Sequence, residues 1–177
     1  MGIILMPRVE SDVAVVTARL PFGSPHDKAV VVGKTLRQAV ERVAKKNGGK
    51  RFVLGVFTLI EENTVEVMAM LNKPGIRPLA TREVTNLWRK EVGEIVGLES
   101  LRYESDRGGP GSGAAITLEL SHSQIETLSK VSEALAERLR ELSNTKDVDN
   151  GYTPGKMQLS FQMTTAGQSL GLTSSEV

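Results

Sequence analysis

The chain has 177 residues, of which 40% are apolar and 24% charged, a composition typical of one globular domain or two small ones. Its 22 Lys and Arg residues are almost balanced by 21 Asp and Glu residues, so the net charge of +1 provides no long-range attraction for nucleic acid or an anionic membrane. The absence of cysteine excludes disulfides, thiolate metal ligands and a thiol nucleophile.

The first predicted elements are a strand and a long helix. Residues 12–20 carry β-branched and small apolar side chains on both faces, which predicts a strand that is well covered. Ser24 and Pro25 then predict a helix start, with Ser24 as the N-cap and Pro25 in the first turn. Residues 47–49 (NGG) predict its end. Its apolar face, at spacings of three and four residues, consists of Ala29, Val32, Leu36, Val40 and Val43.

The next elements complete a familiar order. Residues 52–57 and 65–71 predict two strands, joined by a hairpin around residues 61–63, with a bulge at Gly55. Thr81 is the expected cap of a second helix, whose apolar face consists of Val84, Leu87, Trp88, Val92 and Ile95. A fourth strand is predicted through Leu98, Leu101 and Tyr103. The β-α-β-β-α-β order predicts an α+β fold of the ferredoxin-like type, an antiparallel sheet with both helices on one face.

A second, incomplete unit follows a glycine-rich linker at residues 107–113. Ile116, Leu118 and Leu120 predict a strand, and Ser123 with Glu126 predicts a capping box for a helix. The apolar residues expected on that helix are Ile125, Leu128, Leu135, Leu139 and Leu142, and those of a last strand are Met157, Leu159, Phe161 and Met163. A lone β-α-β half is too small to be stable alone, so we expect the missing half elsewhere in a longer parent protein.

The last residues support the same expectation. Thr173 and Glu176 form a capping box that would open a further helix, but the printed sequence ends at Val177. We therefore interpret the chain as a fragment.

Several motifs occur in a recognisable order: MPRVESD at 6–12, LPFGSP at 20–25, RGGPGSG at 107–113 running into AITLEL at 115–120, and PGKMQL at 154–159 ending in LGLT at 170–173. This order resembles the second large periplasmic loop of resistance-nodulation-division (RND) efflux transporters of the acriflavine-resistance type. The resemblance covers nearly the whole chain.

The resemblance implies a domain organisation. Residues 1–106 would be a complete ferredoxin-like porter subdomain, residues 107–113 the linker, and residues 114–172 the first half of a second porter subdomain. Residues 173–177 would be the truncated start of an inserted docking module. This insertion would explain why the third β-α-β unit has no partner.

The resemblance also implies a function without catalysis or cofactors. Family members are homotrimers in the inner membrane of Gram-negative bacteria, and they export amphipathic small molecules by proton antiport through a periplasmic adaptor and an outer-membrane channel. The chain would be a periplasmic part that works with the membrane helices and docking module of its parent permease. The family's proton-relay acids lie in membrane helices, so none maps onto this chain.

By the same resemblance, the cleft between the two porter subdomains is a substrate entrance and access pocket. The candidate wall residues are Val15, Thr17, Tyr103, Ser105, Arg107, Gly108, Gly109, Pro110, Gly111, Ser112 and Gly113. One feature departs from the family pattern: many multidrug members have a long glycine-rich switch loop between the second and third strands, whereas this chain has a short turn at residues 61–64. Because of this difference, neither gating by such a loop nor the identity of the substrate follows from the resemblance.

Other functions remain as alternatives. The first is a soluble ferredoxin-like ligand-binding or regulatory module that self-associates. An enzyme is disfavoured because the sequence shows no nucleophile–base pair or metal-ligand spacing, and His26 and His122 fit surface or capping roles. RNA binding is disfavoured because the predicted third strand has no aromatic residue. Met68 and Met70 permit a thioether copper site, although core filler is the commoner use.

Overall fold

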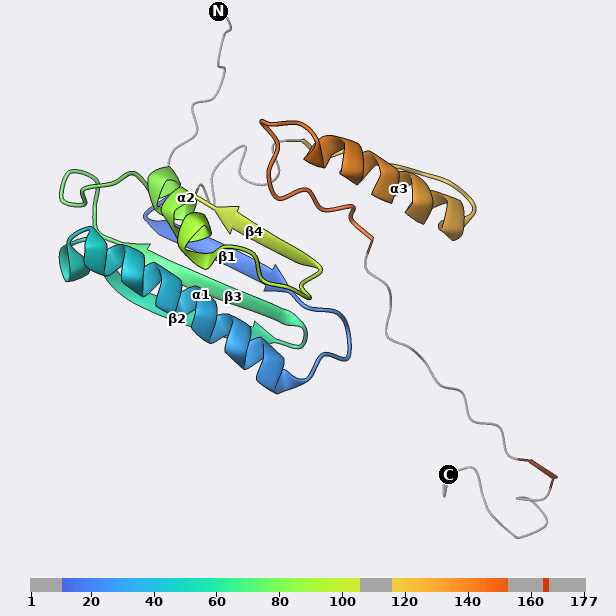
Figure 1. Ribbon diagram of the computed structural model, residues 1–177, viewed down its shortest axis with the longest axis horizontal. Helices are drawn as coiled ribbons and strands as arrows, with labels where there is room; N and C mark the ends of the chain where they lie inside the picture. The colour runs from blue at the N-terminus through green and yellow to red at the C-terminus, as the bar shows by residue number, and fades with distance from the viewer. Residues whose placement is uncertain (1–10, 106–115, 153–163, 166–177) are drawn as a thin grey trace, which may run out of the picture.

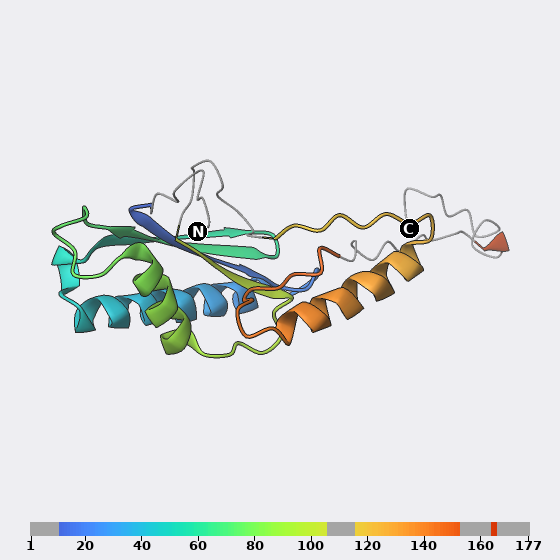
Figure 2. The same cartoon turned by 90° about the horizontal axis from the view of Figure 1, so that it is seen from above.

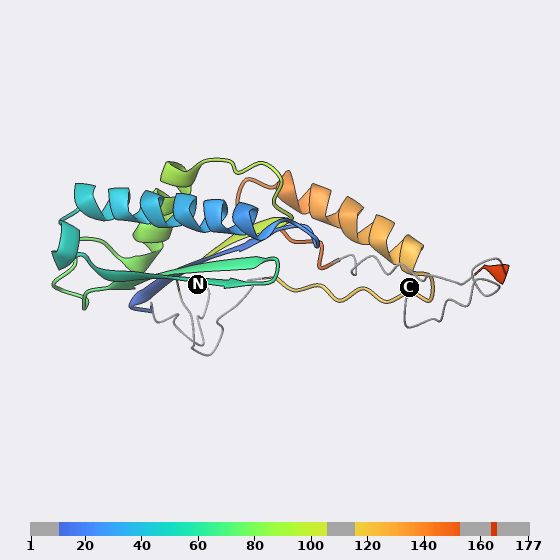
Figure 3. The ribbon, with the colours of Figure 1, turned by 90° about the horizontal axis from the view of Figure 1, so that it is seen from below.

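A four-stranded antiparallel sheet with two helices on one face forms the main body of the structure (Figures 1 and 3). The computed structural model describes residues 11–105, 116–152 and 164–165. In chain order the elements are β1 (Val13–Arg19), α1 (His26–Lys46), the short 3-10 helix η1 (Gly49–Arg51), β2 (Val53–Glu61), β3 (Thr64–Leu71), α2 (Thr81–Val92), β4 (Ser100–Glu104) and α3 (Ile125–Arg140). The sheet order β2-β3-β1-β4 confirms the predicted α+β fold of the ferredoxin-like type.

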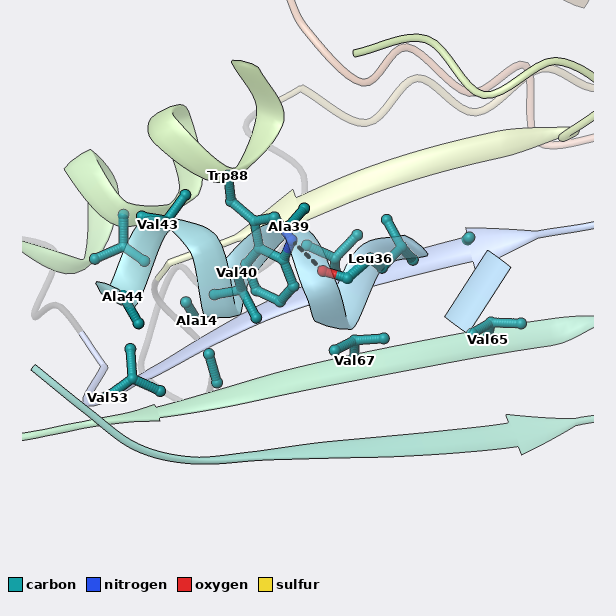
Figure 4. Packing of buried hydrophobic residues seen from close by; sticks show 14 of the residues in the cluster. Ala14, Leu36, Ala39, Val40, Val43, Ala44, Val53, Val65, Val67 and Trp88 are labelled. Carbon is teal, nitrogen blue, oxygen red and sulfur yellow. Dashed lines mark hydrogen bonds between the residues drawn. The ribbon is translucent and has the colours of Figure 1, made fainter. Parts of the chain in front are cut away.

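The core lies between the sheet and helices α1 and α2. The apolar residues predicted on α1 are buried, and they face the alternate residues of the central strands, Val16 of β1 and Val67 of β3. Trp88 of α2 has 0% exposure, and its indole Nε1 donates a 2.8 Å hydrogen bond to the Leu36 carbonyl of α1 (Figure 4). This bond satisfies the indole's polar atom inside the core and ties the two helices together.

Two glycines account for local geometry in α1 and its exit. A Cβ at Gly33 would lie 3.1 Å from Cγ2 of Thr58, so the absence of a side chain there lets α1 approach the sheet closely. Gly48 has φ 111°, a conformation that strains residues with a side chain. The helix accordingly ends with Asn47 as its C-cap, where the sequence predicted it.

The predicted hairpin and bulge are both confirmed. β2 and β3 are joined by the two-residue turn Glu62 and Asn63, and the register between them shifts between Val53 and Gly55. Asn63 also fixes the end of β1, because its Nδ2 donates to the Leu20 carbonyl and its own carbonyl accepts the Leu20 N–H, both at 2.7 Å.

The predicted helix caps were each wrong by one residue. Helix α1 begins at His26, and its N-cap is Pro25. The Ser24 N–H donates a hydrogen bond to the Pro21 carbonyl in the preceding turn. Helix α2 has Ala80 as its N-cap, and the Glu83 carboxylate accepts the Ala80 N–H at 2.9 Å. The Thr81 hydroxyl instead donates to the Ser11 carbonyl at 2.5 Å. The Thr81 hydroxyl therefore makes a long-range hydrogen bond and does not form the helix cap that the sequence had predicted.

The cap of α3 was also wrong. This helix has Gln124 as its N-cap, and the Gln124 N–H donates to Nδ1 of His122 at 3.0 Å. Glu126 lies in the first turn, where its negative charge interacts favourably with the helix dipole. The helix therefore starts one residue later than a Ser123 cap predicts, and the N-cap residue makes no side-chain capping bond.

The second unit differs from its prediction in one respect. Residues 116–120 are not a strand: they run extended beside α3 without a ladder partner among the described residues (Figures 1 and 2). The predicted partner, residues 157–163, lies outside the described residues. A strand requires such a ladder, and here Leu118 instead lines a cavity of about 80 Å³ with Leu135 and Leu139 of α3.

Helix α3 lies beyond the end of the sheet, and it does not pack extensively against any described strand or helix of the main body (Figure 2). Its buried residues are Ser132 and Ala136. In the part of the chain that the structure describes, no helix has the length and apolarity needed to cross a bilayer.

Candidate binding cleft beside strand β4

We call residues 116–152 the α3 unit. Its closest link to the main body is an ion pair between Arg89 and Asp147. Arg89 lies on α2, directly after the buried Trp88, and Asp147 lies in the segment after α3. The Asp147 carboxylate accepts two hydrogen bonds from the guanidinium: Nη2 donates to Oδ2 at 2.7 Å, and Nη1 donates to Oδ1. Such a bidentate pair fixes the orientation of both groups.

Asp147 also covers the open edge of the sheet. β4 is an edge strand, and the Tyr103 N–H donates to Oδ2 of Asp147 at 3.0 Å. A backbone donor at an edge would otherwise be available to another strand. Asp147 itself has φ 57°, a left-handed conformation uncommon for residues other than glycine. Its carboxylate therefore has three donors, and these donors come from two elements of the main body.

Aromatic packing positions Arg89. Its guanidinium carbon lies 4.2 Å from the centroid of the Tyr103 ring, and that ring makes an edge-to-face contact with Trp88 at 6.2 Å. The hydrogen bond to Asp147 raises the pKa of Arg89, an effect that burial partly opposes. Burial raises the pKa of Tyr103 to about 12. The guanidinium thus remains charged and is held between a ring and a carboxylate.

Two polar atoms beside this pair are buried without a hydrogen-bond partner in the described part of the chain. They are Nε of Arg89 and the hydroxyl of Tyr103. A buried donor without a partner lowers the stability of the fold by about 1–3 kcal/mol. Buried polar groups in native structures rarely lack a partner, so these two atoms call for an explanation.

A cavity of about 340 Å³ opens at this ion pair, and we call it the β4 cleft. Its wall includes Arg89, Tyr103, Asp147 and Arg140, with the apolar residues Ile95 and Leu98. A second cavity of about 280 Å³ adjoins it and shares Ser100, Arg140 and Val148. Both cavities are lined by residues of β4 and of the segment after α3.

The α3 side of the cleft has its own charge network. Arg140 donates to Glu133 at 2.9 Å, and Asn150 donates to the other oxygen of the same carboxylate. These bonds, that from Arg140 first, lower the pKa of Glu133. Glu133 thereby holds together the last turn of α3 and the segment that carries Asp147.

The predicted wall residues are placed on two faces. Tyr103 lines the β4 cleft, whereas Val15 and Thr17 of β1 alternate with core residues and lie on the face opposite the helices. Ser105 follows β4, and its carbonyl accepts the Ser11 N–H at 3.1 Å. The structure therefore does not bring Val15 and Thr17 together with Tyr103. The remaining candidates, Arg107, Gly108, Gly109, Pro110, Gly111, Ser112 and Gly113, lie outside the described residues.

Sequence reasoning missed Arg89, Asp147 and Arg140. Arg89 is inconspicuous because an arginine beside a core tryptophan is an ordinary edge residue of an amphipathic helix. Asp147 lies 58 residues from Arg89, and no local periodicity connects them. The turn-forming composition around residues 147–151 was the one available signal, and it indicated a loop without indicating its partner.

The chemistry of the cleft is recognition of charge and apolar surface. No cluster of three or more potential metal ligands occurs among residues 11–105, 116–152 and 164–165. The groups that are present, a guanidinium, a tyrosine and an edge N–H, are donors suited to an anionic oxygen. A scan against protein-family models and searches of curated proteins and of solved structures each found no match to this chain.

Proposed function

We propose that the chain is a porter-domain segment of a proton-driven RND efflux permease, and that its contribution is to form part of a substrate entrance cleft. The proposal rests on the motif order in the sequence together with one structural observation. A ferredoxin-like unit faces a second, less buried unit across a cleft, and few bonds cross that cleft. Such an arrangement permits the two units to separate and close around a ligand.

The proposed setting is the periplasmic side of the inner membrane of a Gram-negative bacterium. The partners are the remainder of the parent permease, its two symmetry copies in a trimer, an adaptor and an outer-membrane channel. The proposed substrates are amphipathic small molecules, because the β4 cleft combines charged groups with apolar residues such as Ile95 and Leu98. Transport itself would require the membrane helices of the parent protein.

The first test is the parent gene. Apolar runs of about 20 residues should precede and follow the segment if it belongs to such a permease. Their absence on both sides would overturn the proposal.

A second test measures the cleft directly in the parent protein. Ser100→Cys places a thiol in the wall of the cleft, and this chain contains no other cysteine. A bulky maleimide should then inhibit export from cells. Lys34→Cys, on the exposed face of α1, is the matched control and should tolerate the same reagent. Equal inhibition of both variants, or of neither, would contradict a substrate path through this cleft.

The alternative of a self-associating module has one observation in its favour. Apolar residues of α3 are exposed, with Ile125 at 69% and Val131 at 50%, so another copy of the chain would find apolar surface there. Light scattering distinguishes the two proposals. A specific dimer of the 177-residue chain that persists on dilution would favour the self-associating module, and a monomer would favour the porter segment.

A further inference from the structure

We propose that Arg89 and the Tyr103 N–H form a carboxylate-binding subsite, that Asp147 is its internal occupant, and that a small amphipathic monocarboxylate competes with Asp147 for it. This inference deepens the proposed function by naming a substrate class for the same cleft. It concerns binding to the chain itself, so it can be tested without transport.

The donors of this subsite are held in place without help from Asp147. Arg89 is positioned by the Tyr103 ring at 4.2 Å, and the Tyr103 N–H is positioned by pairing of β4 with β1. Both elements that supply these donors, α2 and β4, belong to the main body, so the positions of the donors do not depend on the α3 unit. A preformed set of donors loses little entropy when a ligand arrives.

Asp147 is a replaceable occupant of this subsite. It reaches the site from a separate segment with a left-handed backbone, φ 57°, and α3 does not pack extensively against the main body. The segment is therefore held to the main body chiefly at the cleft. A ligand that presents its own carboxylate can take the same bonds while the segment moves away.

The size and the lining of the cleft suit a small amphipathic carboxylate. The β4 cleft measures about 340 Å³, within the usual range for small-molecule sites. Ile95, Leu98 and Leu101 form apolar wall beside the charged corner. A carboxylate with an apolar tail satisfies both parts of this surface. The two unpartnered donors, Nε of Arg89 and the Tyr103 hydroxyl, lie at the same corner and offer additional bonds once Asp147 has left.

The test is calorimetric titration of the full 177-residue chain with decanoate below its micelle concentration, with decanamide as the uncharged probe. Decanoate should bind, and decanamide should bind at least about tenfold more weakly, because charge-assisted bonds are stronger than neutral ones. Asp147→Ala should tighten decanoate binding by about tenfold, because the competitor is gone. Arg89→Gln in the Asp147→Ala background should abolish that gain.

Arg42→Gln is the matched control, because Arg42 pairs with Glu91 on the exposed surface of α1 and α2 and lies outside the wall of the cleft. It should leave decanoate affinity unchanged. The near-ultraviolet signal of Trp88, the single tryptophan of the chain, reports whether each variant is folded. If the Arg89→Gln variant fails to fold, two comparisons still test the inference. These are decanoate against decanamide, and the wild type against Asp147→Ala.

A second readout follows the occupant. Decanoate should increase backbone hydrogen exchange in residues 141–152, because the segment is released from β4. Equal affinity for decanoate and decanamide, or unchanged affinity in Asp147→Ala, would overturn the inference. In contrast, decanoate binding as described with no effect of thiol modification on export would overturn the proposed function and leave the subsite intact.

Discussion

Helices α1 and α3 have similar amphipathic patterns and very different surroundings. Both carry apolar residues at spacings of three and four, and both have acidic residues in the first turn and basic residues in the last. Helix α1 buries eight residues, the set Ala29, Val32, Gly33, Leu36, Ala39, Val40, Val43 and Ala44, whereas α3 buries Ser132 and Ala136. The same kind of pattern therefore produces a core helix in one region and a half-exposed helix in the other.

The difference shows what an amphipathic pattern determines and what it does not. The pattern determines that a helix forms and which stripe is apolar. Burial of that stripe requires a second layer, and a sheet of four strands supplies it for α1. Beside α3 the described residues provide one extended segment, residues 116–120, so much of the stripe remains exposed.

The largest expected contrast is between a core residue of the main body and an exposed apolar residue of α3. Trp88→Ala should lower the free energy of unfolding by about 3–5 kcal/mol, because it empties the centre of the core and removes the bond to Leu36. Val131→Ala in α3 should cost less than about 0.5 kcal/mol, because that side chain is exposed. Urea unfolding followed by circular dichroism measures both. Equal costs would mean that α3 is buried as deeply as α2.

The close approach of α1 to the sheet gives a second contrast. Gly33→Leu should cost about 1–3 kcal/mol, because a side chain there would collide with Thr58 and force the helix away from β2 and β3. Lys34→Leu, one residue further and exposed, is the control and should change stability by less than about 0.5 kcal/mol. The same denaturation curves apply. A Gly33→Leu variant as stable as the parent would show that α1 can move without cost.

The contact between Asp147 and the main body should be weaker than the packing of the core. Arg89→Gln should increase exchange of the amides in residues 141–152 by about tenfold, because the main bonds to Asp147 are lost. Exchange in β1 and β3 should be unaffected. Arg37→Gln, which removes an exposed ion pair with Glu41 inside α1, serves as the control. Unchanged exchange in residues 141–152 would show that other contacts hold the segment.

The smallest effect concerns the Tyr103 hydroxyl. Its pKa is about 12 in the folded chain and about 10 when unfolded, so folding favours the neutral phenol. The resulting stability is fully present below pH 10 and is lost as the pH rises toward 12. Tyr103→Phe should remove most of this loss and change stability at neutral pH by less than about 1 kcal/mol, because the hydroxyl has no partner in the described residues.

Unfolding curves between pH 8 and 12 test this expectation, a range chosen to span both pKa values. Tyr152→Phe is the control, because Tyr152 is exposed, and it should keep the loss of stability at high pH. A Tyr103→Phe variant that retains the full loss would place the pH dependence elsewhere in the chain.

The fold could be predicted from the sequence because its signals are local. The spacing of Val32, Leu36 and Val40 identifies a helix, and the short turn between β2 and β3 identifies a hairpin. The cap at Thr81 was misplaced because a distant group, the Ser11 carbonyl, accepts a hydrogen bond from the Thr81 hydroxyl. The strand predicted at residues 116–120 failed for a related reason, since pairing depends on another segment and not on alternation alone.

The candidate site could not be predicted to the same degree. Tyr103 was expected in the wall of a substrate cleft from the family resemblance; its side chain lines the β4 cleft, and a role in substrate passage stays a prediction. Arg89 and Asp147 were not expected, because their meeting depends on how the chain turns after α3. A pair separated by 58 residues leaves no periodic trace, so only the packed structure reveals it.

The position of β1 has a consequence for how the chain folds. β1 comes first in the sequence and lies in the interior of the sheet, between β3 and β4. β1, residues 13–19, can therefore pair along both of its edges only after residues 64–71 and 100–104 have been synthesised. The β2–β3 hairpin, by contrast, needs no distant residue. During synthesis from the N-terminus the hairpin can close early, whereas the sheet is complete only after Glu104 has emerged, a high-contact-order step that should limit the rate of folding.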